Sequence, residues 1–174
     1  MSGIVIDTNV LLVADGKGTH MGDACRVVCM ERLDRVKTSE QVILDDRWFV
    51  LGEYHNRLSP HGRPTPGNAF LKWLLQVQGD SSHVELVTIT PTNAEQTTFA
   101  EFPPDAALEA AFDPADRKFV ATANAHPEKP PILESADSKW LGWEDQLKKY
   151  GIKIEILCRG ELETIRERKT KKKR

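Results

Sequence analysis

Apolar residues recur along the chain in five short runs that have the composition of buried β-strands. The runs are rich in Val, Ile and Leu and are bounded by polar or turn-forming residues, as in strands covered on both faces. The first run is GIVI, and it ends at Asp7. The other four are QVILDD, HVELVTIT, PPILES and IKIEILC, at 41–46, 83–90, 130–135 and 152–158.

The segments between these runs have helical periodicity. Amphipathic stripes predict helices over 21–37, 47–58, 68–78 and 139–150, with Asp46 as the N-cap of the second. Residues 92–102 and 105–112 predict two short helices divided by prolines, and 59–67 is a proline-rich loop. A further helix is expected to begin with Asp113 as N-cap and Pro114 in the first helical position.

Alternating strands and helices joined by short links predict a three-layer α/β domain with a mainly parallel, five-stranded sheet. The chain has 174 residues, of which 40% are hydrophobic, which suits one domain with a full core. We assign residues 1–160 to this domain and residues 161–174 to a C-terminal tail. No apolar run is long enough to span a membrane, and the start of the chain has no signal-like pattern, so a cytoplasmic location is expected.

Charge is divided unevenly along the chain. The net charge is −2, but residues 166–174 hold seven Lys or Arg and one Glu, which leaves 17 basic and 25 acidic residues, a net of −8, in 1–165. The tail is predicted to be mobile from about residue 167 onward. Two roles remain open for it: a solvated end, or a contact for the phosphates of a polyanion.

The three cysteines do not predict a disulfide framework. Cys25 and Cys29 lie four residues apart near His20, a spacing that is compatible with a metal site. The two cysteines also belong to an apolar helical stripe, which favours buried thiols in the core. Cys158 ends the last predicted strand.

Carboxylates follow the predicted strands or begin the helices beside them. Asp7 follows the first strand, Asp45 and Asp46 end the second, and Asp137 follows the fourth. The carboxyl ends of parallel strands meet at one edge of a sheet, so Asp7 and Asp137 are expected to lie near each other. Gathered carboxylates repel one another, and hard cations such as Mg²⁺ or Mn²⁺ offset that repulsion. Each acid also has a simpler interpretation, because Asp7, Asp113 and Asp137 could serve only as helix caps.

Four segments, in order and spacing, resemble the motifs of PIN-domain nucleases. The segments are IVIDTNVLL, VLGEYHNRL, PADRKFVATANAH and ILESADSKW, and together with the sequence between them they cover residues 3–158. The resemblance implies a sheet in the order 3-2-1-4-5. It also implies a metal-binding set formed by Asp7, Glu53, Asp116 and Asp137 at the carboxyl edge. Asp113 is a further candidate ligand, and Thr8, Asn9 and Ser135 are expected to support the acids.

The resemblance implies a metal-dependent endoribonuclease that leaves 5′-phosphate and 3′-hydroxyl ends, with single-stranded RNA as the expected substrate and DNA as an alternative. A homodimer and an antitoxin or other protein partner are compatible with that family.

Should Glu53 not belong to the site, Asp45 or Asp46 would replace it. Arg117 and Lys118 are candidates for phosphate contacts or for a solvated helix face. Two other hypotheses are a non-catalytic nucleic-acid-binding module and a phospho-acceptor domain, although the latter requires an acid after the third strand, where none stands.

Overall fold

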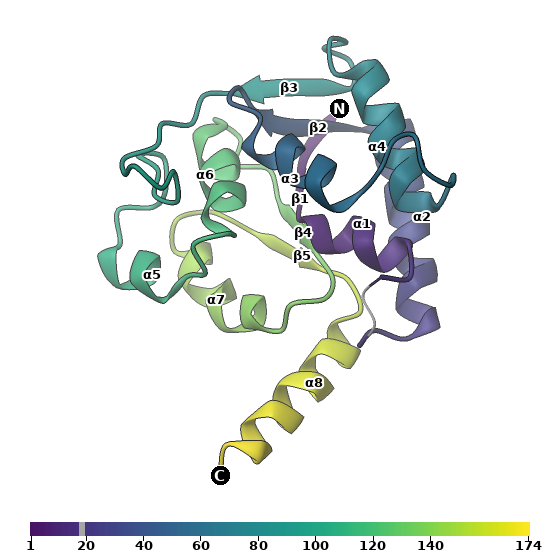
Figure 1. Ribbon diagram of the computed structural model, residues 1–174. Helices are drawn as coiled ribbons and strands as arrows, with labels where there is room; N and C mark the ends of the chain where they lie inside the picture. Colours follow the sequence, from purple (N-terminus) through teal and green to yellow (C-terminus); the bar gives the residue numbers. More distant parts are fainter. Residues whose placement is uncertain (18–19) are drawn as a thin grey trace.

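The computed structural model describes residues 1–17 and 20–174 and has a five-stranded sheet in which every pairing is parallel. The strand order is β3-β2-β1-β4-β5, so both the predicted fold class and the predicted order are confirmed. The strands are β1 (Ser2–Ile6), β2 (Glu40–Asp45), β3 (Val84–Val87), β4 (Ile132–Glu134) and β5 (Ile154–Ile156) (Figure 1).

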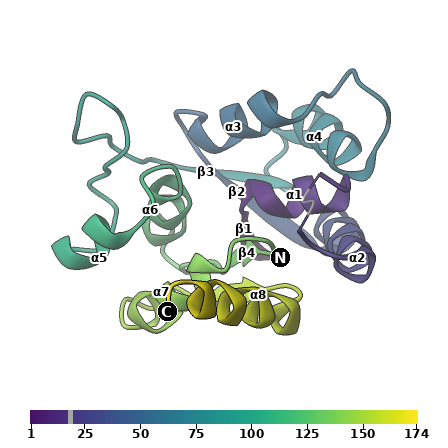
Figure 2. The same cartoon turned by 60° about the horizontal axis from the view of Figure 1, so that its bottom comes forward.

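Helices cover both faces of the sheet. The first four are α1 (Thr8–Ala14), α2 (Asp23–Ser39), α3 (Phe49–Arg57) and α4 (Pro66–Val77). They are followed by α5 (Ala106–Ala111), α6 (Arg117–Ala125), α7 (Lys139–Lys148) and α8 (Arg159–Lys172). Figure 2 shows α1, α2 and α4 on one side of the sheet and α6 and α7 on the other. Because the chain runs 1→2→3 in one direction and returns through β4 to β5, right-handed crossovers require this division.

The core lies between these layers. Ile4, Val5 and Ile6 in β1 and Val42, Ile43 and Leu44 in β2 are completely buried, which explains their unbroken apolar runs. Trp140 and Trp143 of α7 pack with Phe112, and the rings of Phe112 and Trp143 are stacked at 3.8 Å between centroids. None of the described helices combines the length and the apolar composition that a membrane span requires.

Three predicted elements differ from the structure. The segment 92–102 is not a helix; it forms a tight loop closed by an isolated bridge between Pro91 and Phe99. Helix α6 begins at Arg117 rather than beside Asp113, because residues 113–116 form a turn. Asp46 does not cap α3; the buried Asp45 carboxylate accepts the N–H groups of Phe49 and Val50, both at 2.9 Å.

The C-terminal tail is helical. Helix α8 runs through Lys172 and extends away from the body of the molecule (Figure 1). It was not predicted, because Leu162 is its one fully buried residue and an apolar stripe is therefore missing. Its first turn is fixed to the start of α2, where the Gly22 N–H donates to Glu161 Oε1 at 2.6 Å.

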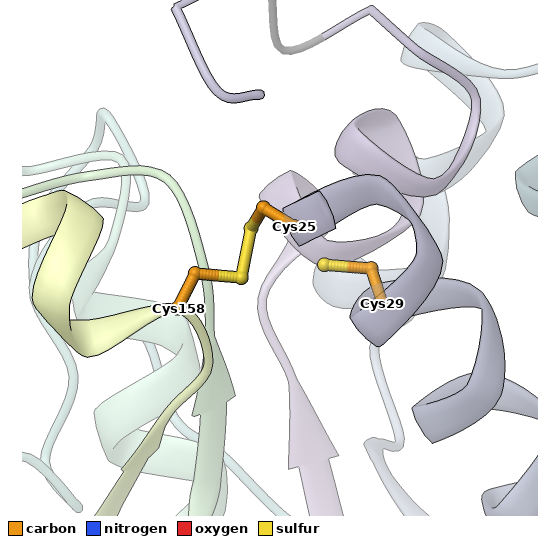
Figure 3. Close-up of side chains that lie close together, drawn as sticks. All are labelled: Cys25, Cys29 and Cys158. Atoms are coloured by element: carbon orange, nitrogen blue, oxygen red, sulfur yellow. A yellow bond between two sulfur atoms is a disulfide. The ribbon is translucent and has the colours of Figure 1, made fainter. Parts of the chain in front are cut away.

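A disulfide strengthens that junction, so the prediction of a buried free thiol is wrong for Cys25. Cys25 in α2 and Cys158 at the N-cap of α8 are bonded, with their Cα atoms 5.6 Å apart (Figure 3). The sequence separation of 133 residues hides this pairing from any local pattern. Cys29 is free and buried, as predicted, and its sulfur lies within 4.8 Å of the other two.

Candidate metal-binding acid cluster

Asp7 lies at the carboxyl end of β1, between the neighbouring strand and the first helix. Its N–H donates to Leu133 O of β4 at 2.9 Å, and its Oδ1 accepts the Asn9 N–H at 2.8 Å. The side chain therefore caps α1 and also faces the edge of the sheet. Burial raises the pKa of Asp7 well above its ordinary range, and the neighbouring charges of Glu134 and Glu53 raise it further.

Glu134 is an acid of this site that the sequence analysis missed. It ends β4 and is completely buried. Oε1 accepts the N–H groups of Ala136 and Asp137, both at 2.8 Å, whereas Oε2 has no hydrogen-bond partner in the described part of the chain. Burial raises the pKa of Glu134 to about 7. Its place inside the apolar run PPILES suggested a strand residue; the only available signal was a charged residue in a run that should be buried on both faces.

Asp116 is brought to the same edge at the start of α6, as the family resemblance implies. It is half-buried, and its pKa is raised to about 8 by burial first and then by the charges of Asp7, Asp113 and Asp137. Asp113 is in a different electrostatic setting, because Lys139 Nζ lies 3.1 Å from its Oδ2 and lowers its pKa. Asp113 is therefore less suited than Asp116 to hold a cation, because Asp116 forms no ion pair with a described residue.

Glu53 in α3 is close enough to Asp7 for its charge to raise the pKa of Asp7. Thr8 Oγ1 donates to Glu53 Oε1 at 2.6 Å, so the residue after Asp7 orients this carboxylate. Lys118 forms an ion pair with Glu53 Oε2. Asp45 and Asp46, the alternatives to Glu53 as members of the site, both have other hydrogen-bond partners. Asp45 caps α3, and Asp46 accepts from the Thr88 hydroxyl at 2.8 Å.

Asp137 and Ser135 follow β4. Asp137 is half-buried, and its Oδ1 accepts the Lys139 N–H at 2.9 Å. The Ser135 hydroxyl is buried and has no hydrogen-bond partner within the described segments. It lies near the Cys29 thiol. Burial raises the pKa of this thiol to about 11, although Ser135 has the opposite effect.

Arg117 and Lys118 do not form a solvated helix face. The Arg117 guanidinium donates to Thr97 O and Phe112 O, each at 3.3 Å, and so links α6 to the preceding loops. Lys118 Nζ contacts both Glu53 and Ala115 O. Both cations therefore have protein partners at the edge of the cluster.

The acids surround a common region without meeting at a point. In residues 1–17 and 20–174, the one group of three candidate ligand atoms within 4.8 Å of one another consists of the cysteine sulfurs. Two of those sulfurs form the disulfide, and soft sulfur ligands do not suit Mg²⁺ or Mn²⁺. The carboxylates are linked instead through their charges, because Asp7 is affected by Glu134 and Glu53, and Asp116 by Asp7 and Asp137.

Comparison with known proteins finds no matching family model, no matching curated protein and no matching solved structure. The fold and the acid cluster thus define the molecule as a parallel α/β domain with five acids gathered at the carboxyl edge of its sheet: Asp7, Glu53, Asp116, Glu134 and Asp137.

Proposed function

We propose that this protein is a metal-dependent nuclease that hydrolyses phosphodiester bonds of RNA with Mg²⁺ or Mn²⁺ bound by the acid cluster. The observation that carries the proposal is the convergence of carboxylates from four separate elements on one edge of the sheet. Asp7 comes from the end of β1, Glu53 from α3, Asp116 from the start of α6 and Asp137 from the loop after β4. Helix capping explains Asp7 in part, but it does not explain why the pKa of Asp116 is raised by the other acids.

The residues fit a hard divalent cation. Every candidate ligand atom is a carboxylate oxygen, the type that Mg²⁺ and Mn²⁺ prefer. Glu134 Oε2 is buried without a partner among the described residues. Burial and mutual repulsion also raise the pKa values of Asp7, Asp116 and Glu134, a cost that a bound cation would offset.

The chain's own residues hold these oxygens in place. The Asn9 N–H fixes Asp7, the Thr8 hydroxyl fixes Glu53, and the Lys139 N–H fixes Asp137. Lys118 beside Glu53 adds a positive charge close to where a phosphodiester would lie. A bound metal ion supplies activation of the attacking water and stabilisation of charge on the phosphate.

Single-stranded RNA is the substrate that we propose, with single-stranded DNA as the alternative. A non-catalytic module of the same fold is the rival hypothesis, and the complete set of acids weighs against it. A homodimer and a protein partner such as an antitoxin remain predictions. The cytoplasmic location also remains a prediction, and the Cys25–Cys158 disulfide weighs against it because such bonds are rare in the cytosol.

The proposal is tested by incubating the protein with end-labelled single-stranded RNA and DNA, with Mn²⁺ and with a chelator. We expect cleavage of RNA with Mn²⁺, 5′-phosphate products and no cleavage in the chelator. Cleavage that persists in the chelator would contradict metal dependence. A cyclic 2′,3′-phosphate product would point instead to attack by the 2′-hydroxyl of the RNA and would contradict the proposed chemistry.

A further inference from the structure

A groove of about 360 Å³ opens beside the acid cluster. Its walls come from the start of α3, the loop around Gln96 and the turn that precedes α6. Glu53 and Lys118 line it, so the groove and the proposed catalytic site share two residues. A nucleic-acid strand with one phosphate at the acids would therefore place an adjacent nucleotide in or over this groove.

Three aromatic side chains line the groove. The rings of Phe49 and Phe99 meet edge to face, with 5.6 Å between their centroids. Both pack against a small separate core that contains Ile89 and Ala121, which holds the rings in position. Trp48 also lines the groove and is 39% exposed, an unusual exposure for the largest apolar side chain. Aromatic faces of this kind are the surfaces on which unpaired bases stack.

Polar groups lie beside the aromatic rings. The side-chain amides of Asn56 and Gln96 both line the groove and are exposed. Neither amide has a protein hydrogen-bond partner in the described residues, whereas the nearby Thr97 hydroxyl accepts from Asn93 Nδ2 at 2.9 Å. Each amide offers both a donor and an acceptor, the pair of groups needed to recognise the edge of a base.

Two residues that line the groove have a strained backbone, and hydrogen bonds from neighbouring residues stabilise the loop of one of them. Trp48 and Gln96 both have positive φ angles, of 63° and 56°, although they come from different loops. The loop of Gln96 is fixed by Asn93 Oδ1, which accepts the N–H groups of Thr97 and Thr98, and by Arg117, which donates to Thr97 O. Strained residues that the surrounding structure maintains are concentrated at binding sites.

From these observations we infer that the groove binds one unstacked nucleobase of the single-stranded substrate, stacked on Trp48 and hydrogen-bonded at its edge by Asn56 and Gln96. This inference rests on the proposed function, because the strand that enters the groove is the one presented to the acids. It assigns to the groove a role in the choice of cleavage site, in addition to the chemistry at the acid cluster.

The test compares two labelled probes by fluorescence anisotropy in a chelator, where cleavage is absent. One probe is a single-stranded oligoadenylate, and the other is a ribose-phosphate strand of the same length without bases. The proteins are the wild type, Trp48→Ala, Asn56→Ala and the control Gln76→Ala, which removes an exposed amide from a separate groove on α4. The melting temperature of each variant is measured to confirm that it folds.

We expect the wild type and Gln76→Ala to bind oligoadenylate about 5- to 150-fold more tightly than the abasic strand, the range given by stacking of one base. Trp48→Ala should reduce this ratio to near one, and Asn56→Ala should reduce it in part. The salt dependence of binding should be unchanged in both variants, because the phosphate contacts remain.

The inference is overturned if the wild type binds both strands equally, if it binds neither, or if Trp48→Ala and Asn56→Ala keep the wild-type ratio. In the last case the groove would be left to another ligand, such as a side chain of a protein partner. Cleavage with Mn²⁺ is measured in parallel. An active enzyme without base preference would overturn the inference alone, whereas a base-selective binder that never cleaves would overturn the proposed activity alone.

Discussion

At the scale of single residues, the acid cluster should make the metal-free protein less stable as pH rises. The pKa of Asp116 is raised to about 8 in the folded state, so the folded protein holds a proton that the unfolded chain releases near pH 4. The protonated Asp116 carboxyl therefore adds stability that is fully present below about pH 4 and is lost as pH rises toward 8. In a chelator, wild-type protein should therefore lose more stability between pH 5 and pH 8 than Asp116→Asn does. Because the carboxylate is only half-buried, we expect a difference of ~1–3 kcal/mol in free energy of unfolding. Equal pH dependence in urea titrations of the two proteins would contradict this expectation.

Glu134 gives a second prediction at this scale. Its Oε1 accepts two backbone N–H groups, and a glutamine amide oxygen can replace it in that role. Glu134→Gln removes a buried charge close to Asp7, so the metal-free protein should become more stable, by about 1 kcal/mol or more. Activity with Mn²⁺ should fall if Glu134 acts on the metal or on the other acids. Thermal unfolding in a chelator and initial cleavage rates measure the two effects; a variant that is both less stable and fully active would contradict the assignment.

At the scale of elements, the disulfide and a few polar contacts hold α8 to the rest of the molecule. Leu162 is its one fully buried side chain, and the remaining links include Glu161 with Gly22 and Lys169 with Ser138. The double variant Cys25→Ser/Cys158→Ser should lose about 2–5 kcal/mol of stability, since the bond closes a long loop. Amide hydrogen exchange should increase more in α8 than in β1. The free thiol provides the control, Cys29→Ala, which should leave the exchange of α8 largely unchanged. Unaltered exchange in α8 of the double variant would show that the disulfide does not hold the helix.

The elements also show what the sequence can and cannot predict. The five strands were found because runs such as IVI and VIL are buried on both faces, and their order followed from the family resemblance. The start of α6 was misplaced because Asp113 and Pro114 resemble a helix start but form a turn. Asp7, Glu53, Asp116 and Asp137, the four acids that the resemblance implies, affect one another's charge at one edge of the sheet, whereas Glu134 was hidden in an apolar strand. The disulfide and the groove at Trp48 could not be predicted, because both join segments far apart in sequence.

In the whole molecule, basic residues near the C-terminus line a groove between two helices. A groove of about 300 Å³ between the start of α7 and α8 is lined by four basic residues, Lys139, Arg166, Lys169 and Lys173, together with Ser138 and Thr170. Lys139 also contacts Asp113, so this basic groove begins at the acid cluster. Arg166 and Lys169 of α8 share one face with Lys173, the C-cap residue of the helix. The arrangement favours a polyanion contact over a purely solvated tail.

Deleting residues 167–174 should therefore raise the apparent KM for RNA and flatten its salt dependence, while cleavage positions stay the same. A sharper comparison uses Lys169→Ala/Lys173→Ala against Arg168→Ala/Lys172→Ala, because both pairs remove two charges from the last seven residues but only the first pair lines the groove. The first pair should lower the slope of log affinity against log salt by about 1.4, as expected for two phosphate contacts with a single strand. Equal effects of the two pairs would show that the overall charge of the tail, and not this groove, sets the affinity for RNA.

In the proposed function, the carboxylates at the edge of the sheet bind the divalent metal ion that cleavage requires. The most direct test is a titration with Mn²⁺ of wild type, Asp7→Asn and the control Asp145→Asn, an exposed acid on α7, with binding followed by electron paramagnetic resonance. We predict that wild type and Asp145→Asn bind Mn²⁺ and cleave RNA. Asp7→Asn, which preserves shape but removes a charge, should lose both properties while its melting temperature is retained or raised. Mn²⁺ binding and RNA cleavage by Asp7→Asn at the level of the wild type would contradict metal binding by these carboxylates.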